Sequence, residues 1–205
     1  MDSHMPHAST TGAALRRAVR LVVLLNLGYF GVEFAVALAI GSVSLFADSI
    51  DFLEDAAVNS LILVALAWSA HRRSLVGMAL AAILLAPGLA TLWTAWEKLS
   101  VPVPPAPMAL SLAGVGALVV NLCCTYLLVR FRTQSGSLTR AAFLSARNDV
   151  LANIAIIAAG LVTATTVSLW PDLIVGLGIF PMNLDAAHEV YTAARRERSL
   201  ASAEP

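Results

Sequence analysis

Charged residues are scarce in this sequence. Asp, Glu, Lys and Arg make up 13% of its 205 residues, 59% are hydrophobic, and the mean hydropathy is +0.79. A typical soluble domain is about 25% charged. The scarcity of charge excludes an ordinary soluble globular protein and indicates one that lies in a lipid bilayer. The formal net charge is zero, so the charge balance does not point to nucleic acid as a partner.

Cysteines and catalytic motifs are also few. The two cysteines, Cys123 and Cys124, are neighbours within an apolar run. Because successive residues of a helix point apart, this pair excludes an intrachain disulfide framework. No HExxH or GxSxG arrangement occurs in the chain. We therefore expect a protein that is not an enzyme and has no cofactor.

Long apolar runs are what the sequence does contain. A helix needs about 20 residues to cross the roughly 30 Å hydrocarbon core of a bilayer, and a backbone in lipid must satisfy its hydrogen bonds internally. Six runs have this length: Leu21 to Ile40, Leu45 to Ala70, Leu75 to Trp96, Met108 to Val129, Ala141 to Val162, and Leu169 to about Ala187. The sequence therefore predicts an all-α, polytopic membrane protein with six transmembrane helices.

The flanking segments complete the predicted domain organisation. A six-helix transmembrane domain (residues 18–190) lies between a polar N-terminal tail (1–17), which can include residues from an expression tag, and a short C-terminal tail (191–205). The sixth run starts with "LWPDL", in which Asp172 follows a proline and is typical of a residue that caps the start of its own helix.

The basic residues predict how the helices are oriented. Lys and Arg concentrate in cytoplasmic loops of membrane proteins. Eleven of the thirteen fall on one side of the predicted helices: Arg16, Arg17, Arg20, Arg72, Arg73, Arg130, Arg132, Arg140, Arg195, Arg196 and Arg198. The opposite loops hold only Lys98, and Arg147 lies inside the fifth run. We expect both termini to be cytoplasmic and the protein to be a multi-pass component of the cell (inner) membrane.

Four acidic residues interrupt the second apolar run, in "FADSIDFLEDAA". An ionisable group in a membrane span costs a few kcal/mol and persists mainly where it faces a polar interior. At 100° per residue, Asp48, Asp51 and Asp55 fall within an arc of about 60° on one helical face. Glu54 lies about 60° further round from Asp51. Three carboxylates therefore project in one direction.

The fifth run supplies a matching polar stripe. Ser145, Asp149 and Asn153 are spaced i, i+4, i+8 and share one helical face. At 1.5 Å per residue, Asp55 lies about 15 Å from the outer end of its run and Asp149 about 12 Å from the inner end of its own, so the two meet near the membrane midplane. Carboxylates that close cannot all stay ionised without a metal ion or protons. We predict a site for a divalent cation at Asp51, Asp55 and Asp149, with metal and protons as exchangeable occupants.

Other polar residues allow two interpretations. Glu33, about 10 Å from the outer face of the first run, and Asp48 could line the approach to the site, with Glu54 and Asn153 on the pathway or behind the ligands. The structural alternatives are a helix-capping role for Asp48 or Asp51, an ion pair between Glu54 and Arg147, and interhelical hydrogen bonding by the asparagines.

These segments together resemble the cation diffusion facilitators, six-helix exporters of Zn²⁺ and other divalent ions. "LNLGYFGVEFAVALAIGSVSLFADSIDFLEDAA" is similar to their first two helices, "AWEKLSVPVPPAP" to the exit of their third, "NDVLAN" to their fifth and "WPDLIVGLGIF" to their sixth. The resemblance implies four metal ligands, two on the second helix and two on the fifth. By position these are Asp51, Asp55 and Asp149, with the fourth ligand falling on Ser145, where the family usually has His or Asp.

The resemblance to this family, together with the positions where the sequence differs from it, defines the expected function. Zn²⁺ is the default cargo, but the absence of an imidazole leaves an oxygen-only set that suits harder ions such as Mn²⁺ or Mg²⁺. Mn²⁺, Co²⁺, Cd²⁺ and Fe²⁺ stay open as alternatives to Zn²⁺. The cytoplasmic C-terminal domain common in the family is not found, so a homodimer would form through membrane helices. We expect export from the cytoplasm by metal/proton antiport. The alternative is a non-transporting metal-binding membrane sensor or a partner subunit of another transporter.

Overall fold

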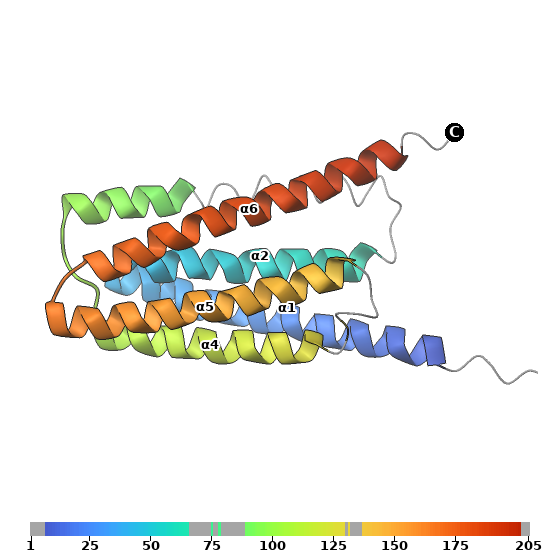
Figure 1. Ribbon diagram of the computed structural model, residues 1–205, viewed down its shortest axis with the longest axis horizontal. Helices are drawn as coiled ribbons and strands as arrows, with labels where there is room; N and C mark the ends of the chain where they lie inside the picture. The colour runs from blue at the N-terminus through green and yellow to red at the C-terminus, as the bar shows by residue number, and fades with distance from the viewer. Residues whose placement is uncertain are drawn as a thin grey trace, which may run out of the picture.

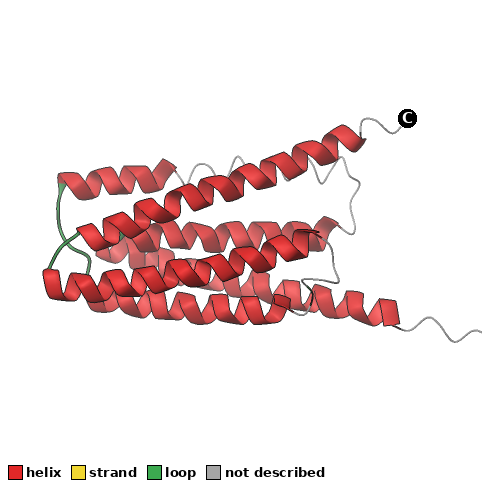
Figure 2. Ribbon diagram, in the orientation of Figure 1, coloured by secondary structure: helices red, strands yellow, loops and turns green. Residues whose placement is uncertain are grey.

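The computed structural model describes residues 7–65, 75, 78, 89–129, 131 and 137–201. Five long helices account for most of them: α1 (His7–Ile40), α2 (Val43–Ala65), α4 (Pro107–Val129), α5 (Ser137–Thr166) and α6 (Trp170–Ala201). A further helical segment covers residues 89–100, and no strand occurs in these ranges (Figure 2). The all-α prediction is confirmed.

The helices run lengthwise as one bundle (Figure 1). α2 is in contact with α1, α4, α5 and α6, while α4 packs most extensively on α5 and also on α1. The α1–α2 and α5–α6 turns lie at the same end of the bundle, hereafter the turn end, whereas α1 begins and α6 ends at the opposite end, the terminal end. α2 is thus surrounded by other helices, and groups on it are shielded from the bilayer.

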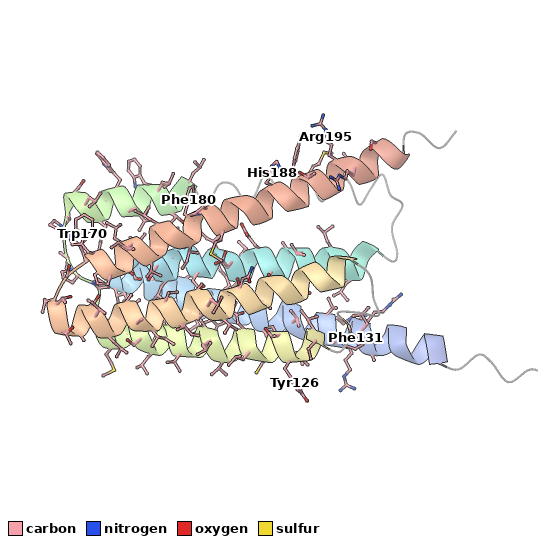
Figure 3. All side chains as sticks on the ribbon, viewed as in Figure 1. Tyr126, Phe131, Trp170, Phe180, His188 and Arg195 are labelled. Atoms are coloured by element: carbon pink, nitrogen blue, oxygen red, sulfur yellow. The ribbon has the colours of Figure 1, made fainter. Side chains whose placement is uncertain are left out.

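Three helical stretches are long and apolar enough to cross a membrane: Gly12–Ile40, Pro107–Val129 and Asn148–Thr166. Large apolar side chains such as Leu24, Tyr126 and Leu161 are exposed on their outer surfaces, as lipid-facing residues are (Figure 3). α2 differs from these three because of its four acidic residues. The structure is that of an integral, multi-pass membrane protein.

Several helix ends differ from the sequence-based bounds. α1 begins at His7, well before the predicted run, and α6 continues to Ala201. Figure 3 shows His188 and Arg195 on this last stretch of α6, directed away from the other helices. The stretch is rich in Ala, Arg and Glu, good helix formers that extend a helix beyond its apolar part. The third run and the end of the second fall largely outside the described residues.

The α1–α2 turn is held by side chains from distant segments. Gly41 adopts φ 61°, the left-handed conformation that glycine accepts at a helix C-terminus. The ammonium group of Lys98 donates a hydrogen bond to the Gly41 carbonyl oxygen. Asp172 does not act as a cap for α6 alone: its carboxylate accepts hydrogen bonds from the backbone N–H groups of Val43 (2.9 Å) and Ser44 (3.1 Å). α6 therefore caps the first turn of α2.

Close helix packing reinforces this anchor. A Cβ atom on Gly176 of α6 would lie only 2.7 Å from the Val43 carbonyl carbon and 2.8 Å from the Ser44 nitrogen. The main apolar core lies alongside and joins all five long helices through small and branched side chains: Ala37, Leu45, Ile50, Leu110, Ile156 and Ile179. The turn end of α2 is consequently fixed against α6 by both packing and hydrogen bonds.

Candidate metal centre

The acidic face of α2 is turned into the bundle. Asp48, Glu54 and Asp55 are buried, with exposed fractions of 0%, 4% and 6%, and Asp51 is half-buried. This burial follows from the position of α2, which contacts four other helices. Asp55 lies twelve residues from the start of α2, which is about 18 Å along the axis and so deep within a bilayer-sized bundle.

α5 brings Asp149 to the same depth. The Asp149 side chain is buried, with 7% exposed, and its carboxyl group is close enough to that of Asp55 to share a hydrogen bond. Asp51 is near enough to this pair to interact with the charges of both Asp149 and Asp55. The structure thus brings together the three residues that the sequence pairs by spacing and depth.

The three carboxyl groups are neighbours, but they do not form a closed coordination shell. Within the described parts of the chain, no three or more His, Cys, Asp or Glu side chains are arranged to hold one metal ion. One Asp51 oxygen, Oδ2, is buried without a hydrogen-bond partner. The arrangement is a contact between Asp55 and Asp149 with Asp51 alongside, rather than a preformed cage.

Polar residues one turn from the carboxylates continue the two stripes. Ser145 precedes Asp149 by one turn of α5, and its side chain lies outside the described residues. Asn153, one turn on the other side, is fully buried, and neither polar atom of its amide has a partner. On α2, the amide nitrogen of Asn59 donates to the Asp55 carbonyl oxygen at 2.8 Å, and its own oxygen has no partner. These amides could serve as additional oxygen ligands.

Glu33 and Asp48 do not join the Asp55–Asp149 contact but face each other across the α1–α2 interface. Glu54 lies near Asp55, and its Oε1 atom has no partner. The proposed ion pair of Glu54 with Arg147 involves a side chain outside the described residues. Two acidic clusters therefore occupy α2, one shared with α5 and one shared with α1.

Cys124 of α4 is a neighbour that the sequence reasoning missed. Its thiol is fully buried, lies 3.8 Å from the Asn26 side-chain oxygen, and is near enough to Asp55 and Asp149 to interact with their charges. The available signal was the helical spacing of Asn121, Cys124 and Leu128, which share the buried face of α4. A thiol at this position would add a soft ligand to a set otherwise built from oxygen.

The model of one protein family, described as the cation efflux transmembrane domain, matches residues 19–191, which includes both acidic clusters. The chain belongs to the cation efflux family. No curated protein matches it. Cation efflux proteins are membrane transporters of divalent cations rather than enzymes, so membership agrees with the apolar spans of the structure. Among the described residues, the buried carboxylates of α2 and α5 are candidates for a polar site within the bilayer.

Proposed function

We propose that this cation efflux protein moves a divalent cation through a site formed by Asp51, Asp55 and Asp149, in exchange for protons. The observation that supports the proposal is the contact between the buried carboxyl groups of Asp55 and Asp149 across α2 and α5. Two such groups in a dry interior need a positive charge between them, and either a dication or a proton supplies it. A metal ion that binds between Asp55 and Asp149 therefore displaces the proton that they hold in its absence.

The ligand types bear on which ion is carried. Carboxylate and amide oxygens suit Mn²⁺ and Zn²⁺, and Ser145 adds another oxygen where the resemblance places a stronger ligand. The nearby Cys124 thiol extends the range towards Zn²⁺ and Cd²⁺. We propose Zn²⁺ as the first cargo to test, with Mn²⁺, Co²⁺, Cd²⁺ and Fe²⁺ as competitors.

The proposal includes direction and assembly. The predicted cytoplasmic position of both termini makes the terminal end the loading side and the turn end the release side, so transport is export. We propose a homodimer that assembles through membrane helices. Light scattering on the purified protein measures its molar mass and so tests whether it is a dimer.

The decisive experiment is metal uptake into liposomes that carry an internal fluorescent indicator and an imposed pH gradient. Wild type should take up at least one of the five ions, and Asp55→Asn and Asp149→Asn should not. Glu97→Gln, which removes an exposed carboxylate at the turn end, is the matched control and should transport normally. Normal uptake by both Asn variants would overturn the site. Tight metal binding without flux in the wild type would favour the sensor alternative.

A further inference from the structure

Glu33 of α1 and Asp48 of α2 form a second acidic pair that the proposed metal site does not use. Both side chains have an exposed fraction of 0%. Their carboxyl groups are close enough to share a hydrogen bond, yet none of the four oxygens receives one from any donor group. Two buried carboxylates in contact without a donor would repel each other, and each would lack the partner that burial requires.

Among the described residues, no basic group lies against the pair to neutralise it. The other titratable groups that interact with it are Tyr29 of α1, Asp51 of α2 and Asp149 of α5. α4 has no charged residue, and its contact here is the Ala113 carbonyl oxygen, which accepts from the Tyr29 hydroxyl at 2.5 Å. α6 and the 89–100 segment direct Asp172 and Lys98 to the α1–α2 turn instead. The pair must be neutralised by something that it binds.

A proton fits this site better than a metal ion. Two acidic side chains meet here among the residues that the structure describes, whereas a divalent ion needs about four to six ligands. Both side chains are fully buried, so a divalent ion would have to bring several water ligands into the helix interface, whereas a proton needs none. One proton turns one carboxyl group into a donor for the other, giving an O–H···O hydrogen bond between α1 and α2 and halving the charge.

We infer that Glu33 and Asp48 share one proton and release it to solvent when a divalent cation occupies the Asp51–Asp55–Asp149 site. The inference rests on the proposed function, and it names the residues that hold a counter-ion for the exchange. Asp48 precedes Asp51 by three residues on the same face of α2, and its charge acts on both Asp51 and Asp149. A dication at that site therefore favours the ionised form of the pair. The step balances as one metal ion bound and one O–H proton lost from the pair.

The test is the number of protons released for each metal ion bound. Purified protein in detergent, weakly buffered and containing a pH-indicator dye, is titrated with Zn²⁺ or Mn²⁺, and bound metal is measured separately by equilibrium dialysis. Glu33→Gln and Asp48→Asn keep the shape and supply a permanent amide donor, but they cannot release the proton. Each should bind metal at the three-aspartate site while the protons released per ion fall by about one. Glu97→Gln should release the wild-type number.

The outcomes separate this inference from the proposed function. If wild type binds no metal, the proposed function fails; if wild type and both amide variants release equal numbers of protons, the shared proton is overturned while the function stands. An infrared difference spectrum of the wild type provides a measurement that needs no variant to fold. Protonated-carboxyl C=O bands, shifted in D₂O, should disappear on metal addition both from the Glu33–Asp48 pair and from the Asp55–Asp149 contact, and loss of only one such band would contradict the release. Where the variants fold, the band of the pair should be missing from both.

Discussion

Asp172 of α6 and Asp48 of α2 are both fully buried, and they differ in what surrounds them. Asp172 accepts four hydrogen bonds, from the hydroxyls of Ser42 and Ser44 at 2.6 Å and from the N–H groups of Val43 and Ser44. Asp48, less than two turns further along α2, receives none on either oxygen. A carboxylate surrounded by donors stabilises the fold, whereas one without donors costs folding free energy and is typical of a group that must exchange its partner.

The largest expected effect separates transport from stability at the two carboxylates of the candidate metal centre, Asp55 and Asp149. Asp55→Asn or Asp149→Asn should lower the rate of metal uptake by about 100-fold or more, because each removes a ligand. The free energy of unfolding in detergent should stay the same or rise by about 1 kcal/mol, because one of two buried carboxyl groups in contact is made neutral. A variant that unfolds far more easily than wild type would show that these carboxylates are structural.

The opposite result is expected at Asp172. Asp172→Ala leaves two hydroxyls and two N–H groups at the start of α2 without their acceptor, so the free energy of unfolding should fall by about 3 kcal/mol. Asp172→Asn keeps one acceptor oxygen and should lose roughly 1 kcal/mol. Thermal unfolding of both variants measures the difference. Equal stability of Asp172→Ala and wild type would remove the distinction between the two aspartates.

Close packing at the turn end can be tested with two neighbouring glycines. Gly176→Ala places a methyl group against the backbone of Val43 and Ser44 and should destabilise the protein by about 2 kcal/mol. Gly178→Ala is the matched control, because a Cβ atom there meets nothing within 4 Å. Unfolding temperatures of the two variants should differ by several degrees. Similar temperatures would mean that α6 can move away from α2 at no cost.

The smallest expected effect concerns ion preference. Cys124→Ser exchanges a buried sulfur for oxygen near the candidate centre and should lower Cd²⁺ uptake relative to Mn²⁺ by about threefold. Cys123→Ser is the control, because that thiol is exposed on the other side of α4. Competition between the two ions in the liposome assay gives the ratio. An unchanged ratio would place Cys124 outside the coordination shell.

The features of this fold that follow from helical periodicity were predictable from the sequence. Apolar runs of membrane length predict helices, and 100° per residue places Asp48, Asp51 and Asp55 on one face of α2. The rise per residue then predicts that Asp55 and Asp149 share a depth, and the structure brings them into contact. The metal, the protons and the cytoplasmic position of the termini stay predictions.

Contacts between distant segments were not predictable in the same way. Asp172 looks like a cap for its own helix, and its partners on α2 lie about 130 positions earlier in the chain. The mutual approach of Glu33 and Asp48 depends on the rotation of α1 against α2, which neither residue reveals alone. Cys124 reads as an ordinary apolar residue until α4 is packed against the bundle. Helical periodicity gives the face of each helix, but the pairing of faces comes from packing.

Asp172 and Gly176 hold the start of α2 against α6, so α2 can tilt about this end. Asp55 lies about 18 Å along the helix from it, and a tilt of about 10° therefore displaces the Asp55 carboxylate by roughly 3 Å. Metal–oxygen bonds tolerate only about 0.2 Å of change. A rotation small enough to leave the cap and the glycine contact intact is therefore large enough to assemble or dismantle a coordination shell at the proposed metal site.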